Sequence, residues 1–318
     1  MILPYSKAPF FTCYNYMTFP FNVIESNSEL DITKLMFIKA FNVQFDNASI
    51  QNKFTFVVDD PWGISEGLTT SQYVSLQKKM LTGVNIDIVA FFNKLIDSGH
   101  YIHCGYSEKR ASKITNKDDY HSPDFLVYGY LDKDYYISST CDEKNIVLLK
   151  LSESELLERI YTADDELLEF SLFKYNKNNT PQYLKEKAIK VLEEYISGGV
   201  QTLEKKHYGI NAITALKCYI ESYEVTKDNF NVLLRYLRAF SEHKKLLLKF
   251  VYLLFDDKEI ESYVSVFQKN YELAKSIECK LNNRQFDNVI YMFDKIIENE
   301  KKFVPIILNN LKNDCEEI

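Results

Sequence analysis

Residues 125–139 read FLVYGYLDKDYYISS, and this stretch decides the fold class. Two runs rich in aromatic and aliphatic residues, Phe125–Tyr130 and Tyr135–Ser139, are typical of strands. The four residues between them, Leu131–Asp134, carry two aspartates and a lysine and indicate a hairpin turn. We therefore predict an antiparallel sheet built around this hairpin.

Further strands and two helices are predicted on either side of the hairpin. The additional strands have β-rich composition and span Lys53–Val58, Tyr101–Cys104 and Asn145–Leu149. A helix is predicted over Asn85–Asp97, because its apolar residues recur at helical spacing and Gly99 follows its end. A second helix is predicted over Leu151–Tyr161, where Ser152 and Glu155 form a capping-box pattern.

The second half of the chain has helical periodicity. The polar stretch Lys174–Pro181, with three asparagines and a proline, indicates a domain boundary. Beyond it, apolar residues form helical stripes within Leu184–Tyr195, Ile260–Ala274, Phe286–Ile297 and Phe303–Leu311. The predicted fold class is α+β, with an antiparallel-sheet domain over residues 1–175 and an all-helical region over residues 182–318.

The composition is that of a globular protein without nucleic-acid or membrane partners. Of 318 residues, 46% are hydrophobic and 26% are charged, which suffices for a substantial core. The net charge of −7 disfavours binding to a phosphate backbone. The longest apolar stretch, Leu246–Phe255, contains Lys249 and is too short to cross a bilayer. Lys244 and Lys245, with Lys249, are predicted to form the solvated flank of a helix.

The cysteine spacing and the absence of known motifs disfavour several classes of site. The six cysteines are scattered without a C-x-x-C pair, which disfavours both a zinc site and a disulfide framework. Reduced thiols fit a cytoplasmic protein, and Met1–Ser6 does not resemble the start of a signal peptide. The motifs of P-loop, dinucleotide-binding, zinc-protease and serine-hydrolase proteins are absent, so we expect no cofactor and no metal.

Cys13 and His121 are the candidate catalytic residues. Cys13 precedes a stretch with helical character, Tyr14–Ile24, which Pro20 would shorten or kink. A thiol at a helix N-terminus has a lowered pKa and acts as a nucleophile, although a buried apolar cysteine is the common alternative. His121 stands just before the strand Phe125–Tyr130, where a histidine serves as general base for a distant cysteine or is simply a solvated loop residue.

Three other groups of residues give weaker signals. His100 and His103 flank a strand at a spacing that places them on opposite faces, so we do not expect them to share a metal. Trp62 follows a turn and is either the wall of a pocket or a core anchor. The run Glu242–Lys244 opens an apolar helix and predicts either a substrate contact or a cluster of ion pairs.

The order of these features resembles a known family. Four features are similar to those of a particular papain-fold domain. They are Cys13 after a proline-containing lead, a helix ending before Gly99, the stretch DFLVYGY at 124–130, and the return strand Tyr135–Ile137. That domain is the N-terminal part of the family of butirosin biosynthesis protein H, whose members occur in bacterial nonribosomal peptide and other natural-product clusters. YGINA at 208–212 and the run Glu242–Lys244 resemble the family's helical C-terminal part.

The resemblance implies a cysteine acyltransferase. Such an enzyme transfers an acyl group from the phosphopantetheinyl arm of an acyl or peptidyl carrier protein onto a small-molecule amine. Cys13 would be the nucleophile and His121 its base. An acidic carrier protein would need a basic patch on this acidic chain, and Lys244–Lys249 is the candidate.

Two positions depart from the pattern of papain-like domains. Pro123 occupies the place where the histidine usually stands, and Ser138 and Ser139 occupy the place of the Asp or Asn that orients it. Three aspartates are candidates to orient His121 instead: Asp124, Asp132 and Asp142. We take Asp124 as the third predicted catalytic residue. An inactive binding module on the same fold and a cysteine peptidase or amidase are the alternatives to the acyltransferase.

Overall fold

The fold is α+β, with antiparallel sheets and a helical C-terminal region, which confirms the predicted class. It was established from a computed structural model. The structure describes residues 1–29, 31–49, 53–77, 87–104, 121–141, 145–161, 167–180, 182–201, 206–222, 227–254 and 261–313.

The chain forms two units, and each draws on two separate stretches of sequence. Unit 1 comprises Met1–Leu30 and Asp60–Pro181, whereas unit 2 comprises Asp31–Asp59 and Gln182–Ile318. The chain crosses between the units after Leu30, Asp59 and Pro181, and the third crossing falls at the end of the predicted boundary region. The sequence prediction, however, placed residues 31–59 in the N-terminal domain, and they belong to unit 2 because a strand from this segment pairs with a strand after residue 200.

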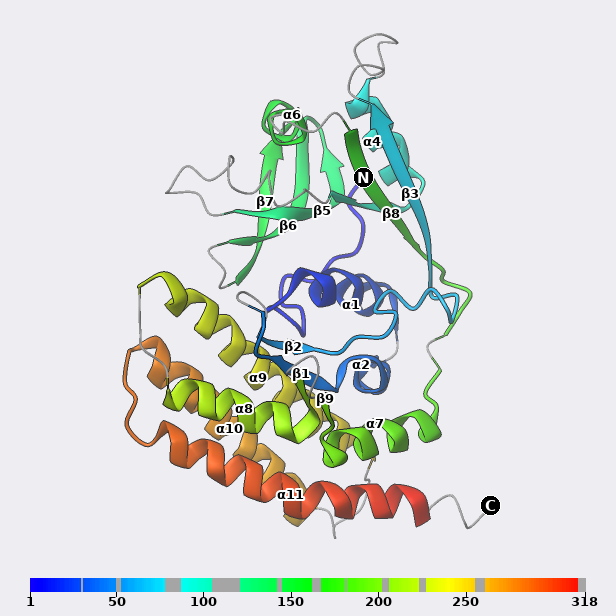
Figure 1. The fold of residues 1–318 in the computed structure, drawn as a ribbon. Coiled ribbons are helices and arrows are strands. Elements are labelled where there is room, and N and C mark those ends of the chain that lie inside the picture. The colour runs from blue at the N-terminus through cyan, green and yellow to red at the C-terminus, as the bar shows by residue number, and fades with distance from the viewer. Residues whose placement is uncertain are drawn as a thin grey trace. The chain divides into compact units, whose positions relative to one another are not determined.

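Unit 1 contains a six-stranded antiparallel sheet with the strand order β3-β8-β4-β5-β6-β7 (Figure 1). Its strands are β3 (Thr69–Gln77), β4 (His100–Cys104), β5 (His121–Leu131), β6 (Asp134–Cys141), β7 (Asn145–Ser152) and β8 (Leu167–Tyr175). The predicted hairpin is confirmed, because only Asp132 and Lys133 separate β5 from β6. Asp132 has a φ of 57°, a left-handed conformation that a short polar side chain tolerates in a turn.

Among the residues that the structure describes, three helices pack on this sheet. They are α1 (Asn15–Asn27), α4 (Ile88–Asp97) and α6 (Glu153–Tyr161). Helix α1 contacts β5, β6 and β8, helix α4 contacts β4 and β5, and helix α6 contacts β6 and β7. Between α1, α4 and the sheet lies an apolar core that includes Phe19, Phe92 and Phe125, each at most 1% exposed.

Local capping explains why the predicted helices of unit 1 begin and end where they do. Asp87 is the N-cap of α4, and its carboxylate accepts from the backbone N–H groups of the second and third helical residues. Gly99 follows that helix with a φ of 87°, as its sequence position indicates. The capping box of α6 is reciprocal: Ser152 N donates to Glu155 Oε2 (2.7 Å), and Glu155 N donates to Ser152 Oγ (3.3 Å).

Unit 2 combines a small four-stranded sheet with long helices. The sheet has the order β2-β1-β10-β9 and consists of β1 (Val43–Asp46), β2 (Phe54–Phe56), β9 (Val200–Gln201) and β10 (Lys206–Tyr208). The helices are α2 (Thr33–Ala40), α7 (Lys185–Ser197), α8 (Gly209–Glu221), α9 (Lys227–Leu254), α10 (Glu261–Asn282) and α11 (Val289–Asn313). The region after residue 182 is therefore helical with two short strands, and the prediction that it is all-helical is wrong.

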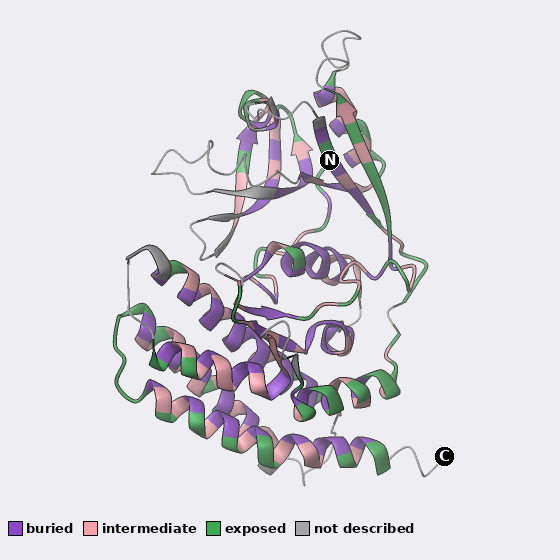
Figure 2. Ribbon diagram, viewed as in Figure 1, coloured by how far each residue is buried: buried purple, intermediate pink, exposed green. Residues whose placement is uncertain are grey.

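Aromatic stacking joins the two stretches of unit 2. Phe37 of α2 stacks on Phe250 of α9 with ring centroids 3.5 Å apart, and Phe41 stacks on His243 at 4.5 Å. Buried and exposed residues alternate at helical spacing along α11, as an amphipathic helix requires (Figure 2).

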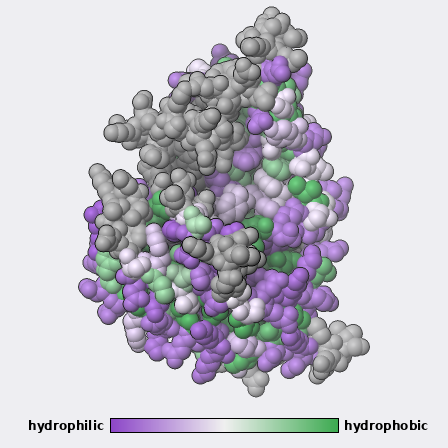
Figure 3. All heavy atoms as spheres, viewed as in Figure 1, coloured by the Kyte–Doolittle hydropathy of each residue, from purple (hydrophilic) through white to green (hydrophobic). Residues whose placement is uncertain are grey.

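The visible surface is mixed in polarity. On the face drawn in Figure 3, hydrophilic residues predominate over the C-terminal helices, with hydrophobic residues scattered between them. In the part of the chain that the structure describes, none of the helices has the length and apolar character needed to span a membrane.

Candidate functional site

Cys13 lies at the start of the helix that packs on the sheet of unit 1. It immediately precedes Tyr14, the N-cap of α1, and its side chain is buried at 5% exposure. Thr18 Oγ1 donates to the backbone carbonyls of Phe11 (2.9 Å) and Tyr14 (3.0 Å), which fixes the lead to the first turn of the helix. The predicted position of Cys13 before a helix is thus observed, and Pro20 lies within that helix without ending it.

Contacts along β4 define the direction of α1 over the sheet. Near the end of the helix, Asn27 Nδ2 donates to Tyr101 Oη (2.8 Å), close to the beginning of β4. Eight residues earlier, the ring of Phe19 lies 5.6 Å from the ring of His103, further along β4. Helix α1 therefore runs antiparallel to β4, so its N-terminal end lies toward the end of β4.

The same direction leads toward the beginning of β5. Strand β4 is antiparallel to β5, and its last residue, Cys104, pairs with Phe125. The residues of β5 that precede Phe125 extend past the end of β4, and the first of them is His121, which pairs with Cys141 of β6. The N-terminal end of α1, next to Cys13, therefore points toward the end of the sheet at which β5 begins.

The side chains of His121, Pro123 and Asp124 lie outside what the structure describes, although their backbone belongs to β5. The pairing of β5 with β6 shifts its register between His121 and Phe125. The side chains of this segment therefore need not point alternately to the two faces of the sheet. The pairing of Cys13 with His121, and the role of Asp124, consequently stay predictions.

Ser138 and Ser139 are fully buried, and Ser138 has a defined partner. Tyr5 Oη donates to Ser138 Oγ (3.0 Å). Asp132, one of the three aspartates considered as orienting groups, lies in the turn at the opposite end of β5. An 11-residue strand places it about 33 Å from His121, so Asp132 cannot orient that histidine. Asp142 lies outside the described residues.

The lead before Cys13 is held against β5 by backbone pairing. Leu3 N donates to Tyr128 O (2.8 Å), and Tyr130 N donates to Met1 O (2.7 Å). A Cβ added to Gly129 would lie 2.7 Å from the backbone of Ile2, so only glycine allows this approach. The first residues of the lead therefore lie along β5 and are joined to it by an antiparallel bridge between Ile2 and Gly129.

Tyr5 occupies the interior between this lead and the sheet. Its ring stacks on Tyr128 with centroids 4.7 Å apart. Burial raises the pKa of Tyr5 far above its usual value of 10.0, while its hydrogen bond to Ser138 opposes the rise. The same cause, burial, raises the pKa of Tyr101 to about 12. Both phenols are therefore hydrogen-bond donors at neutral pH and not general bases.

The run Glu242–Lys244 does not open a helix as predicted, and Lys244 is not solvated. Of the two roles predicted for the run, an ion pair is present, between Lys244 and Glu300. All three residues are buried in the middle of α9. Lys244 Nζ lies 2.7 Å from Oε1 and 2.8 Å from Oε2 of Glu300, which also accepts from Tyr195 Oη. Because Lys244 is 1% exposed, it cannot contact a carrier protein. Lys244 is therefore not part of the basic patch that was predicted over Lys244–Lys249.

Trp62 has a structural role. Trp62 stacks on Phe173 with ring centroids 3.5 Å apart, and it packs against the core of unit 1 as an anchor. Within the described ranges, no group of three or more His, Cys, Asp or Glu residues is placed to hold a metal ion.

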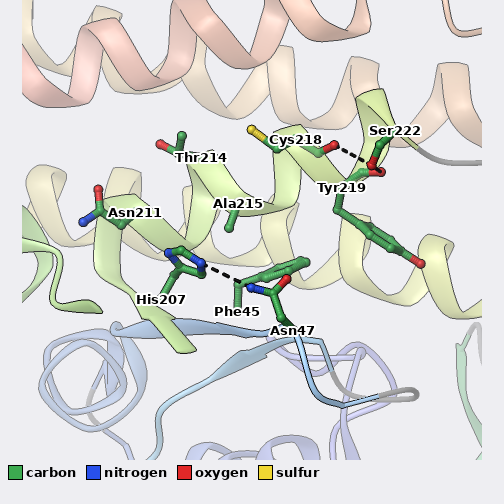
Figure 4. Close-up of a pocket in the computed structure, with 9 residues that line it drawn as sticks. All are labelled: Phe45, Asn47, His207, Asn211, Thr214, Ala215, Cys218, Tyr219 and Ser222. Carbon is green, nitrogen blue, oxygen red and sulfur yellow. Dashed lines mark hydrogen bonds between the residues drawn. The ribbon is translucent and has the colours of Figure 1, made fainter. Parts of the chain in front are cut away.

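A pocket that sequence reasoning missed lies within unit 2 (Figure 4). Its volume is about 530 Å³, and it is lined by Phe45, Asn47, His207, Asn211, Thr214, Ala215, Cys218, Tyr219 and Ser222. These residues lie on or directly after β1, β10 and α8, and they are brought together by the pairing of β1 with β10 and by the packing of α8 on β1. No local sequence motif links segments so far apart.

Comparisons with known proteins do not assign this chain. No protein-family model matches it, and no curated protein is significantly similar to it. Arguments about function therefore depend on the residues and the geometry described above.

Proposed function

We propose that this protein is a papain-like cysteine acyltransferase, with Cys13 as its nucleophile and His121 as its base. The observation that carries the proposal is the placement of Cys13 directly before α1, whose N-terminal end points toward the beginning of β5. Papain-like sites require a cysteine at a helix start and a histidine from a neighbouring strand. Cys13 precedes the N-cap of α1 and His121 is the first residue of β5, which supports the proposal.

The helix supports thiolate chemistry at this position. The first turn of an α-helix carries a partial positive charge, which stabilises an anion beside it. Helix α1 has 13 residues and no side-chain hydrogen bond from its N-cap. A thiolate at Cys13 would therefore lie near the positive end of this helix.

Acyl transfer would proceed in two balanced steps. The Cys13 thiolate attacks the thioester carbonyl of a phosphopantetheinyl carrier, and the carrier sulfur leaves and takes the proton held by His121. An amine then attacks the acyl-Cys13 thioester to form an amide, Cys13 leaves as thiolate, and His121 takes the proton lost by the amine. The exchange between thioesters is nearly balanced in energy, which suits a cysteine nucleophile.

A binding module on the same fold is the second candidate, and one observation favours it. In the resemblance, Ser138 takes the place of the orienting Asp or Asn, and its hydroxyl accepts from Tyr5. A serine held in this way is a weak substitute for a carboxylate or amide that fixes the histidine tautomer. In such a module, Cys13 would be a packing residue.

The deciding experiment uses an acyl-pantetheine thioester and follows the protein by intact mass. The acyltransferase predicts one acyl adduct on the wild type, its loss in Cys13→Ala, and its release by an added amine as an amide. The matched control is Cys104→Ala, which removes another buried cysteine of unit 1 that is not in a disulfide and must keep the adduct. Release by water without an amine would identify a hydrolase instead. Absence of any adduct, with iodoacetamide reacting no faster at Cys13 than at Cys279, would support the binding module.

A further inference from the structure

A second pocket lies within unit 1, at the end of the sheet where β4 begins and β8 ends. Its volume of about 570 Å³ falls within the range of about 300–1,000 Å³ that is typical of ligand pockets. The lining comes from the lead before Cys13, from the C-terminal ends of α1 and α4, and from the ends of β3, β4 and β8. All of these residues belong to unit 1.

This pocket is distant from the candidate nucleophile. Asn27, the last residue of α1, lines the pocket, whereas Cys13 precedes the N-cap of the same helix. An α-helix of 13 residues is about 20 Å long. A small molecule bound here would therefore not reach Cys13, and the pocket is separate from the proposed acyltransferase site.

Two lysines in the lining have no carboxylate partner. Lys174 lies near the end of β8 and Lys177 just after it, and neither forms an ion pair with any carboxylate that the structure describes. A Cβ added to Gly99 would lie 3.6 Å from Lys174 Cε, so the Lys174 side chain lies against that glycine. The turn that carries Lys177 is held by Asn179, whose Nδ2 donates to Gly67 O (3.0 Å). Both ammonium groups are therefore free to pair with a ligand.

His100, which pairs with Lys174 in the sheet, adds no charge at neutral pH. Its Nδ1 lies 2.7 Å from the Oγ of Ser98, a residue of the lining. Burial lowers the pKa of His100 below 6.5, the backbone of Leu95 opposes the shift, and the charge of Lys174 adds to it. The imidazole is therefore neutral at pH 7, and Lys174 carries the positive charge at this position.

The same pocket contains a carboxylate and two helix C-termini. Asp97 Oδ2 accepts from Tyr130 Oη (2.8 Å), and Asp97 forms no ion pair with any cation that the structure describes. The amino group of Met1, which also lines the pocket, donates to Tyr130 O (2.7 Å). Helix α1 ends at Asn27 and α4 ends at Asp97, and the C-terminal end of a helix carries a partial negative charge. The lining thus presents positive and negative groups that do not neutralise one another.

We propose that this pocket binds an acidic α-amino acid, a small zwitterion with two carboxylates and one ammonium group. The carboxylates would pair with Lys174 and Lys177, and the ammonium group would pair with Asp97 near the helix C-termini. A plain dianion would leave Asp97 without a partner, and a plain amine would leave both lysines without one. The proposal does not depend on the acyltransferase, because it involves neither Cys13 nor His121.

The probe is L-aspartate, titrated into the full chain and followed by calorimetry at low ionic strength, because salt screens exposed charges. Binding should be saturable. Succinate, which lacks the ammonium group, and L-alanine, which lacks the second carboxylate, should each bind at least about fivefold more weakly, which corresponds to about 1 kcal/mol. Equal affinity for succinate would identify a plain anion site and overturn the proposed class of ligand. Equal affinity for L-alanine, or no saturable binding of L-aspartate at millimolar concentration, would overturn it as well.

Charge-removing variants locate the site. Lys174→Met and Lys177→Met should each weaken L-aspartate binding at least about fivefold. Asp97→Asn keeps an acceptor for Tyr130 and should abolish the preference for L-aspartate over succinate. The control is Lys301→Met, at an exposed lysine of unit 2 that also has no ion pair, and it should bind normally. All four side chains are exposed, so thermal unfolding should match that of the wild type and exclude misfolding as the cause. Normal binding by Lys174→Met, or an unchanged preference in Asp97→Asn, would refute this location.

Discussion

Lys244 Nζ lies 2.7 Å from a carboxylate oxygen of Glu300, and neither side chain is more than 1% exposed. The two residues belong to α9 and α11, and Tyr195 of α7 donates to the same carboxylate. Three helices of unit 2 are thus joined through one buried charge pair. Burial opposes the charge on Lys244 and lowers its pKa, while the nearby Glu300 carboxylate counters that effect.

Removing one partner of this pair should be strongly destabilising. Glu300→Gln leaves a buried ammonium without its counter-charge, and we expect a loss of about 3–5 kcal/mol in the free energy of unfolding. The double variant Lys244→Met/Glu300→Leu should recover most of that loss, since no buried charge remains. Urea unfolding followed by circular dichroism measures both.

An exposed pair on the same helix provides the control. Lys295 and Glu298 lie 2.9 Å apart on α11, with side chains 44% and 69% exposed. Solvent screens such a pair, so Glu298→Gln should change stability far less than Glu300→Gln. Equal effects of the two substitutions would show that the buried pair has no special role in unit 2.

His243 should make unit 2 sensitive to acid. Its imidazole is fully buried against Phe41 and Tyr195, and burial, followed by the charge on Lys244, lowers its pKa well below 6.5; the backbone of Phe41 opposes the shift. The unfolded chain therefore binds a proton more readily than the folded chain. The stabilisation is complete above about pH 6.5 and is lost as the pH falls below it, by up to about 1.4 kcal/mol per pH unit.

The variant His243→Phe tests this titration. Phenylalanine retains stacking on Phe41 and has no proton to gain, so its free energy of unfolding should fall less between pH 7 and pH 5.5 than that of the wild type. Carboxylates titrate in both proteins, and the difference between the two slopes isolates His243. Parallel slopes would show that His243 does not titrate in this range.

Tyr5 and Ser138 should be energetically coupled. Their hydrogen bond of 3.0 Å joins the lead before Cys13 to β6 in the interior of unit 1. Tyr5→Phe keeps the stack on Tyr128 and should cost about 1 kcal/mol. In a double-mutant cycle with Ser138→Ala, the two losses should be less than additive by a similar amount. Strict additivity would mean that the hydroxyl groups do not interact.

Local chemistry made parts of unit 1 predictable. The hairpin at 131–134, the cap Asp87 and the capping box of Ser152 with Glu155 depend on residues within a few positions of one another. Cys13 before a helix is a signal of the same kind. By contrast, β3 escaped prediction because it is an edge strand of mainly exposed polar residues, held by its pairing with β8 about 100 residues later.

Long-range partners explain the errors. Lys244 has the sequence context of a solvated lysine, and only Glu300, 56 residues further on, keeps it buried. The pocket of unit 2 likewise depends on the pairing of Gln44 with Tyr208. The orienting group of the candidate catalytic site is not predictable from sequence for a similar reason, because several aspartates are near in sequence and only folding excludes Asp132.

The misplaced domain boundary leads to a prediction about fragments. A fragment of residues 182–318 loses the strand pairing between β10 and β1, and it lacks Phe37 and Phe41, which stack on Phe250 and His243. We expect this fragment to expose apolar surface and to unfold without a cooperative transition. Joining residues 31–59 to its N-terminus through a flexible glycine–serine linker should restore cooperative unfolding, because the whole of unit 2 is then present. Thermal unfolding followed by near-ultraviolet circular dichroism distinguishes the two, and a cooperative transition in residues 182–318 alone would show that the N-terminal segment is dispensable for this unit.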